Sequence, residues 1–198
     1  MLLKTELATA PVENIVLLTA LTSSEALSAA PRFRACIGMG GNLGDVRGHL
    51  KAALSGIADL PGTELESVSS LYQTRPVDAT GPDYLNAVAV VQTALGPREL
   101  LGALHALEAG CDRQRPYQNA PRTLDLDLLC HGDAHRQTLS LTLPHPRMMA
   151  RAFVLEPLVE ALTGLQPEPF SPAPSLPTLE RRAALSAKQG IVRLDESL

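Results

Sequence analysis

The chain has 198 residues, of which 45% are apolar and 19% charged, and its formal net charge is −4. This length allows one good core with an appendage, and the negative charge argues against non-specific nucleic-acid binding while leaving room for a locally basic phosphate site. No apolar run is long enough to span a membrane. Cys36, Cys111 and Cys130 are too few and too widely spaced for a disulfide framework or a zinc site, so we expect reduced thiols in a cytoplasmic protein.

Residues 1–31 are expected to form an N-terminal extension, with a helix around residues 13–21. Lys4 followed by the apolar run at residues 15–18 gives a faint likeness to a signal peptide. Acidic residues stand where such a leader carries positive charge, and the apolar run is only marginal in length, so the likeness does not favour secretion.

After this extension the chain alternates between patterns typical of strands and patterns typical of helices. Apolar residues recur every three or four positions where helices are expected, and they alternate or form Val-rich runs where strands are expected. The expected elements are strand 34–39, helix 46–57, a strand with its continuation 63–74, strand 84–93, helix 97–108, strand 123–130, a short helix 153–162, a helix 178–185 and a final segment 191–194 that is either a strand or packs on the domain. This order predicts an α+β fold with helices packed on one antiparallel sheet.

The most informative stretch is residues 121–129, where Asp125 and Asp127 alternate with leucines. Side chains two apart on a strand share a face, so the two carboxylates point the same way while the leucines enter the core. Two strand steps place their Cα atoms roughly 6.6 Å apart. That spacing suits one hard cation held between them, or a metal pair about 3.5–4 Å apart. The alternative is a pair of solvated acids on an ordinary strand.

Arginines and a histidine flank the two aspartates. Arg113 and Arg115 precede the strand, Arg122 opens it, and His145 and Arg151 follow it. Guanidinium groups grip phosphate oxygens with two parallel hydrogen bonds. Together with carboxylates able to hold cations, they favour a polyphosphate site.

These motifs, in this order, resemble the 6-hydroxymethyl-7,8-dihydropterin pyrophosphokinase family of folate biosynthesis. The matching stretches are residues 37–45, 69–77, 83–88, Glu108 with Arg113 and Arg115, 121–129, 144–147 and 151–158. Pro-Arg-Thr-Leu-Asp-Leu-Asp followed by Pro-His-Pro-Arg is highly specific, whereas the Gly-x-Gly-Gly fragment alone is weak. The resemblance implies a ferredoxin-like α/β sandwich with long active-site loops, in a domain over residues 32–165. A proline-rich tail, residues 166–198, is expected to pack on this domain.

The resemblance also implies which residues bind which substrate. Asp125 and Asp127 match the ligands of two Mg²⁺ ions, and Arg113 and Arg122 match the arginines that orient the phosphates during transfer. The other matches for ATP are Leu101, His105, Glu108, Arg115, Leu128, Thr142, His145 and Arg151. The matches for the pterin are Thr74, Val77, Tyr84, Asn86 and Phe153. Asn86 is expected to hydrogen-bond the edge of the pterin, with Tyr84 and Phe153 on its two faces.

The implied reaction is transfer of pyrophosphate from ATP to the hydroxymethyl group of the pterin, with release of AMP, by a monomer without nucleic-acid or membrane partners. Two alternatives stay open. A nucleotidyltransferase-like enzyme is one, because palm domains also carry paired aspartates on a ferredoxin-like sheet, but it predicts a basic groove that this acidic chain does not indicate. A non-catalytic pterin- or nucleotide-binding module is the other, and it is expected to have lost an aspartate or a core arginine, whereas all of them are present.

Overall fold

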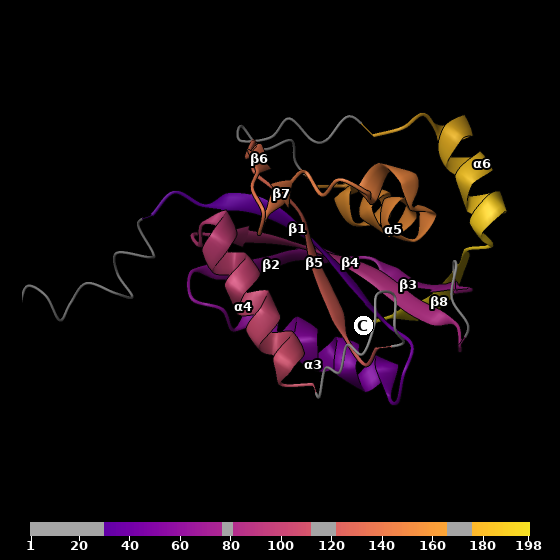
Figure 1. Ribbon diagram of the computed structural model, residues 1–198, viewed down its shortest axis with the longest axis horizontal. Coiled ribbons are helices and arrows are strands. Elements are labelled where there is room, and N and C mark those ends of the chain that lie inside the picture. The colour runs from indigo at the N-terminus through magenta and orange to yellow at the C-terminus, as the bar shows by residue number, and fades with distance from the viewer. Residues whose placement is uncertain (1–29, 77–80, 112–121, 166–175) are drawn as a thin grey trace, which may run out of the picture.

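The computed structural model describes residues 30–76, 81–111, 122–165 and 176–198 (Figure 1). A six-stranded antiparallel sheet forms the centre of this part of the chain. Its strands are β1 (Phe33–Gly41), β2 (Thr63–Val68), β3 (Ser70–Thr74), β4 (Tyr84–Thr93), β5 (Asp125–His131) and β8 (Val192–Ser197). The helices are α3 (Val46–Ala58), α4 (Pro97–Ala109), α5 (Ala152–Leu162) and α6 (Leu179–Gln189). The helix expected at residues 13–21 lies outside the described residues.

The order of the elements confirms the predicted α+β, ferredoxin-like architecture. From β1 to β5 the chain runs β1, α3, β2, β3, β4, α4, β5. Because β2 and β3 pair with successive parts of β4 and act as one interrupted strand, this is the βαββαβ pattern of that fold. In space the strands follow the order β5-β1-β4-β3-β8, and β2 pairs with β4. β5 is therefore an edge strand of the sheet, whereas β1 and β4 lie inside it.

Helices cover both faces of the sheet, and each face has its own core. Ala35, Ile37 and Met39 of β1 pack with α3 and α4, whereas Cys36, on the opposite face, packs with α5. Figure 1 shows α3 and α4 on one side of the sheet and α5 on the other. β4 is buried on both faces, which explains its continuous run of Val and Ala. All three cysteines lie among the described residues and none forms a disulfide.

Helix α3 begins where the sequence predicts. Asp45 caps it, because its side chain accepts a hydrogen bond from Gly48 N–H at 3.0 Å. The stretch 63–74 alternates poorly because it is two strands. Ser69 belongs to neither strand: its N–H still donates to the Val88 carbonyl at 2.9 Å, but its hydroxyl accepts from Val88 N–H at 3.0 Å. β2 therefore pairs with the far half of β4 and β3 with its beginning.

The segment between β5 and α5 was not predicted in detail. It contains a two-stranded antiparallel sheet, formed by β6 (Arg136–Gln137) and β7 (Thr142–Leu143), and the 3-10 helix η1 (Met148–Ala150). At the C-terminus, α6 packs against α5 and β8 adds to the sheet beside β3. The last expected segment is thus a strand. None of the helices in the described ranges is long and apolar enough to cross a membrane.

Candidate active site

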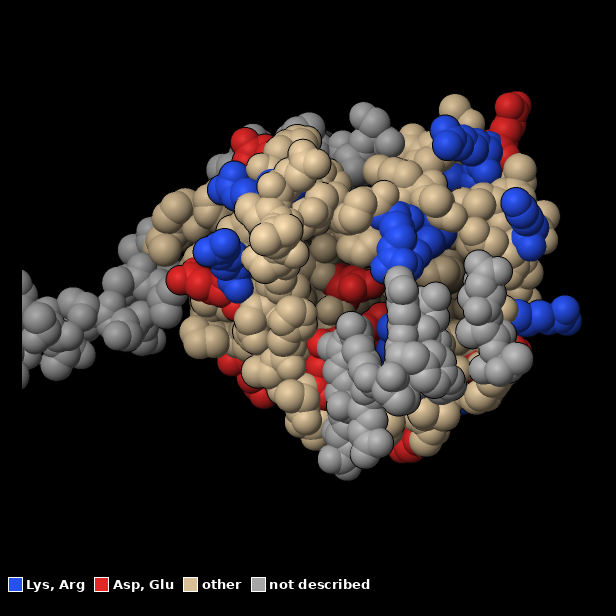
Figure 2. Space-filling view, in the orientation of Figure 1, with Lys and Arg blue, Asp and Glu red and all other residues tan. Residues whose placement is uncertain are grey.

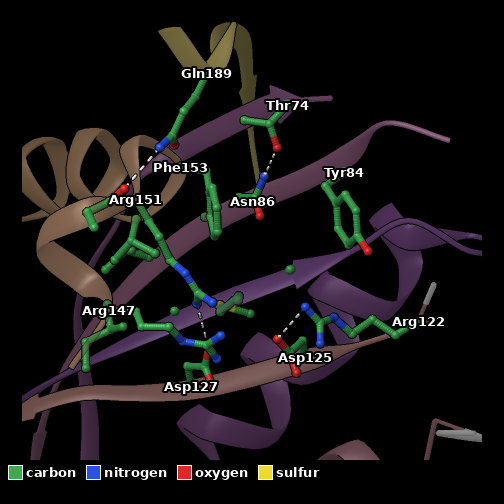
Figure 3. A pocket seen from close by; sticks show the side chains of 18 of the residues that line it. Thr74, Tyr84, Asn86, Arg122, Asp125, Asp127, Arg147, Arg151, Phe153 and Gln189 are labelled. Carbon is green, nitrogen blue, oxygen red and sulfur yellow. Dashed lines mark hydrogen bonds and ion pairs between the residues drawn. The ribbon is translucent and has the colours of Figure 1, made fainter. Parts of the chain in front are cut away.

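A cavity of about 340 Å³ lies on the α5 face of the sheet, over β1, β4 and β5 (Figure 3). It brings together eight residues that the sequence predicts for the site: Thr74, Tyr84, Asn86, Arg122, Asp125, Asp127, Arg151 and Phe153. They come from four separate elements and two loops, so their convergence is a property of the fold and not of any one motif.

Strand register gives this cavity its floor. Gly40 of β1 lies opposite Asn86 of β4 on one side and opposite Asp125 of β5 on the other, and Gly38 lies opposite Asp127 in the same way. Opposite residues share a face, so Gly38 and Gly40 form a lane without side chains between Asn86 and the carboxylates. With neighbouring strands ~4.8 Å apart, this glycine lane separates Asn86 from Asp125 by roughly 10 Å.

Each aspartate has a guanidinium neighbour. Nη2 of Arg122 lies 3.3 Å from Oδ2 of Asp125, and Nη1 of Arg151 lies 3.9 Å from Oδ2 of Asp127. These arginines offset the repulsion between two carboxylates that line the same cavity. Asp125 is more buried, with 14% of its side chain exposed against 39% for Asp127.

The two carboxylates fit a hard divalent cation that takes its remaining ligands from water and a phosphate group. Carboxylate oxygens are the protein ligands that Mg²⁺ prefers, and Mg²⁺ beside polyphosphates uses one or two carboxylates and takes its other ligands from water and phosphate. Within the described ranges, no group of three or more His, Cys, Asp or Glu side chains is placed to hold a metal. The pair of aspartates alone therefore suits Mg²⁺ bound together with a nucleotide and not a site enclosed by the protein.

Basic side chains surround the carboxylates. Arg147 lines the cavity beside Arg122 and Arg151. It belongs to the matching stretch 144–147, but no binding role was predicted for it. Burial, and then the positive charge of Arg147, lowers the pKa of Arg151 from its ordinary value. In Figure 2 basic atoms lie just below α5 and acidic atoms lie next to them along β5. Such a concentration of desolvated positive charge favours an anionic ligand.

The opposite end of the cavity is built to hold a flat, polar molecule. Figure 3 shows Tyr84 and Phe153 on either side of Asn86. The amide nitrogen of Asn86 donates to Thr74 Oγ1 at 3.0 Å and, more weakly, to the carbonyl of Tyr72 at 3.4 Å. These bonds turn its oxygen toward the glycine lane, where it lies 3.1 Å from the position that a Cβ on Gly40 would take.

Two of the arginines also lie over the aromatic rings. The Cζ atom of Arg122 is 5.9 Å from the centre of the Tyr84 ring, and that of Arg151 is 5.4 Å from the centre of the Phe153 ring. Both distances are within the range of cation–π attraction. The aromatic and basic parts of the cavity are therefore contiguous.

Asn42 joins the loops that carry these residues, and sequence reasoning assigned it no role. It is 4% exposed, its Oδ1 accepts from Arg122 N–H at 2.9 Å and its Nδ2 donates to the Pro82 carbonyl at 3.1 Å. Its own N–H donates to the Arg122 carbonyl at 2.9 Å. Asn42 thus ties the end of β1 to the approach of both β4 and β5. In the sequence, the only sign of this role is that a polar residue directly follows a glycine-rich strand.

Three predicted residues do not line the cavity: His145 lies beside its two carboxylates, whereas Leu128 and Glu108 lie on the opposite face of the sheet, toward α4. His145 donates its backbone N–H to the Leu129 carbonyl at 2.8 Å, and burial lowers the pKa of its ring, with Asp127 acting in the opposite direction. Leu128 is 3% exposed and packs in the core under α4. Glu108 is 1% exposed and accepts from Leu126 N–H at 2.9 Å.

The other predicted residues divide into two groups. Leu101 and His105 lie on α4 and Thr142 on β7, away from the cavity lining. Val77, Arg113 and Arg115 lie outside the described residues. The binding roles of both groups stay predictions. Besides Arg147, sequence reasoning missed Arg75 and Gln189, which also line the cavity. Gln189 is far from every motif in the sequence, and no pattern marked it.

Comparison with known proteins agrees with this arrangement. Residues 36–163 match the model of the family described as 7,8-dihydro-6-hydroxymethylpterin-pyrophosphokinase (HPPK). Three proteins called 2-amino-4-hydroxy-6-hydroxymethyldihydropteridine pyrophosphokinase are similar. The one from Synechocystis sp. is 43% identical over 64% of this chain and 65% of its own length, just under two thirds. The one from Pseudomonas aeruginosa is 41% identical over 67% of this chain and 83% of its own.

The third, from Haemophilus influenzae, is 41% identical over 66% of this chain and 82% of its own. A crystal structure of an HPPK-DHPS in complex with substrates also aligns, with a TM-score of 0.45 and 12% identity over 64% of this chain and 39% of that one. That likeness is too distant to bear on the site. The family match and the bacterial relatives suffice to show that the chain belongs to the HPPK family.

Proposed function

We propose that this protein transfers pyrophosphate from ATP to the hydroxymethyl group of 6-hydroxymethyl-7,8-dihydropterin, releasing AMP, as a step of folate biosynthesis. Membership of the HPPK family supports this reaction. The single structural observation that carries it is the glycine lane. The space between the rings of Tyr84 and Phe153 lies at one side of this lane, and the paired carboxylates with their surrounding arginines lie at the other.

The pterin occupies the end of the cavity at Asn86. Its ring lies between Tyr84 and Phe153, where stacking on aromatic faces favours a flat heterocycle. The Asn86 oxygen accepts a hydrogen bond from the amino edge of the ring. Because Asn86 is held by Thr74, the orientation of its amide is set before the ligand arrives, which reduces the entropy that binding costs.

The triphosphate occupies the end with the aspartates. Arg122, Arg147 and Arg151 contact its oxygens, and His145 contributes a further hydrogen bond. Nδ1 of His145 accepts from Arg147 N–H at 3.2 Å, so the proton of the neutral ring resides on Nε2, which can donate to a phosphate. Because β5 is an edge strand, the nucleoside extends past it toward Leu101, His105, Glu108, Leu128 and Thr142. Arg113 and Arg115 complete the set of phosphate ligands.

Asp125 and Asp127 hold two Mg²⁺ ions, which, when bound, supply positive charge beside the phosphates and make the pterin hydroxyl easier to deprotonate. The protein's own residues align the two substrates and stabilise charge. The hydroxymethyl group loses its proton to solvent as its oxygen attacks the β-phosphorus, the bond from that phosphorus to the oxygen bridging the α-phosphate breaks, and AMP leaves with that oxygen and the electron pair. Arg122 stabilises the charge that develops during this transfer. Holding both reactants in line and neutralising charge supplies most of the rate.

The substrates in this proposal are small molecules, and we place the enzyme in the cytoplasm as a monomer that needs no nucleic acid or membrane. The reduced state expected for its thiols supports that compartment. The family match at residues 36–163 supports the expected division into an N-terminal extension, a pyrophosphokinase domain and a C-terminal tail.

The test is to incubate the protein with ATP, Mg²⁺ and the hydroxymethyl dihydropterin and to identify the nucleotide product. We expect AMP in an amount equal to that of pterin pyrophosphate, and none after chelation of the metal. Formation of ADP would indicate ordinary phosphoryl transfer, and release of pyrophosphate would indicate nucleotidyl transfer. Pterin binding without any product would indicate the non-catalytic module.

A further inference from the structure

The junction between η1 and α5 carries one residue for each substrate. Arg151 precedes the first residue of α5, Ala152, and Phe153 follows it, so the conformation of three consecutive residues orients both a phosphate ligand and a stacking ring. A helix N-terminus leaves backbone N–H groups without partners inside the helix. Arg151 occupies the N-cap position of α5, but within this described part of the chain its side chain accepts no hydrogen bond from the first turn of the helix.

Gln189, the last residue of α6, supplies the missing partner. Its Oε1 accepts from Ala152 N–H at 2.8 Å, and its Nε2 donates to the Ala150 carbonyl at 3.0 Å. One amide therefore brackets the last residue of η1 and the first residue of α5. Figure 3 shows this amide at the wall of the cavity above Arg151 and Phe153. Gln189 also lies beyond residues 36–163, which the family model matches.

The position of Gln189 is itself set by its surroundings. Two residues of α6 hold the helix against α5, because Arg182 Nη1 and Ser186 Oγ donate to the carboxylate of Glu156 at 3.1 and 3.0 Å. Directly after Gln189 the helix stops at Gly190, whose φ of 62° is favourable only for residues without a Cβ. β8 then joins the sheet beside β3. The amide thus reaches the junction from a fixed point.

We propose that Gln189 is a positioning residue, whose bracket on Ala150 and Ala152 sets Arg151 toward the phosphates and Phe153 toward the pterin. This inference rests on the proposed function of the cavity. Loss of the bracket leaves the N–H of the buried Ala152 and the Ala150 carbonyl without the Gln189 amide and lets the junction turn. Both substrates are then affected, because small displacements of aligned groups are costly in rate.

The test compares two variants of the full-length protein with two controls. Gln189→Met keeps the length of the side chain and removes both hydrogen bonds, whereas Gln189→Glu keeps the acceptor for Ala152 N–H. Lys188→Ala changes the neighbouring exposed residue, and Ser186→Ala loosens the contact of α6 with Glu156 without touching the junction. The readouts are pterin affinity by fluorescence titration without ATP, kcat and KM for each substrate, and hydrogen exchange of residues 148–155.

For Gln189→Met we expect pterin affinity and kcat/KM for both substrates to fall roughly tenfold, with faster exchange at the junction and a lower thermal midpoint, because the buried Ala152 N–H loses its partner. Gln189→Glu should lose less pterin affinity, Lys188→Ala should behave as wild type, and Ser186→Ala should lose much less than Gln189→Met because Arg182 still holds α6 to Glu156. Wild-type pterin affinity in Gln189→Met would overturn the inference, and so would an equal loss in Ser186→Ala. If the wild-type protein forms no AMP, the proposed function fails. The exchange measurement still decides whether the bracket orders the junction.

Discussion

Gly38 is a position where the stability of the sheet and the binding of a ligand should respond in opposite directions. It lies in the middle of β1, between Val88 and Asp127 on the neighbouring strands, and it lines the cavity. A Cβ added here would meet Leu129 Cδ2 at 3.4 Å, which is an ordinary van der Waals contact. The fold can therefore accept Gly38→Ala without rearrangement, while the new methyl group stands in the glycine lane.

The magnitudes follow from these two facts. Replacing glycine by alanine where the backbone suits both stabilises a protein by about 0.4–1 kcal/mol, through the unfolded chain. For a chain of this size that corresponds to a rise of about 1–4 °C in Tm. On the binding side, one extra methyl group in a closely filled space costs about 1–3 kcal/mol. If the pterin lies over Gly38, kcat/KM should fall roughly 5- to 160-fold.

The assay is thermal unfolding by circular dichroism, together with steady-state AMP formation. Gly102→Ala is the matched control, because Gly102 lies on the exposed side of α4 with nothing within 4 Å of an added Cβ. It should raise Tm by a similar amount and leave kcat/KM alone. Full activity of Gly38→Ala would show that no ligand uses the lane. A lowered Tm would show that β1 cannot accept a side chain there.

Three further changes test other parts of the site and fold. Asp127→Asn should abolish AMP formation while pterin affinity changes little in an equilibrium titration, and a near-normal rate would exclude its role at the metal. Asn42→Ala removes the hydrogen bonds to Arg122 N–H and the Pro82 carbonyl, at about 0.5–1.5 kcal/mol each, so both Tm and kcat should fall, whereas a fall in Tm alone would exclude a part in catalysis. Burial raises the pKa of Glu160, but hydrogen bonds from Arg193 and two hydroxyl groups outweigh it, and the net pKa lies below 4.5. The ionised Glu160 therefore stabilises the fold above pH 4.5. The difference in unfolding free energy between wild type and Glu160→Gln should shrink as the pH falls through the folded-state pKa of Glu160. A difference that does not depend on pH would contradict this.

Much of the fold could be predicted because its signals are local. The alternation of Asp125 and Asp127 with leucines predicts which side chains share a face, and the cavity contains both carboxylates. The cap at Asp45 and the apolar stripes of the helices are likewise contained in short windows. The break between β2 and β3 was missed because it depends on a hydrogen bond between Ser69 and Val88, which are far apart in the chain.

The rest of the site could not be predicted because it depends on pairing between distant segments. In the sequence, Gly38 and Gly40 indicate only a strand that runs into a loop. Their use as a floor appears once Asn86 and Asp125 are known to lie on either side of Gly40. Gln189 is a more extreme case, because its partners are backbone groups, which carry no residue-specific signal.

The distance between the two halves of the cavity is set by the core of the opposite face. Leu124, Leu126 and Leu128 are each at most 3% exposed and pack in the core under α3 and α4. A shift of β5 by one residue would turn all three leucines out of this core and turn both carboxylates into it, so the hydrophobic effect keeps Asp125 and Asp127 on the cavity face, where they lie beside Gly40 and Gly38. Burial of a leucine is favourable by about 1.5–3 kcal/mol, which makes the shifted register very unfavourable. The separation of a pterin from a triphosphate therefore depends on the packing of the opposite core.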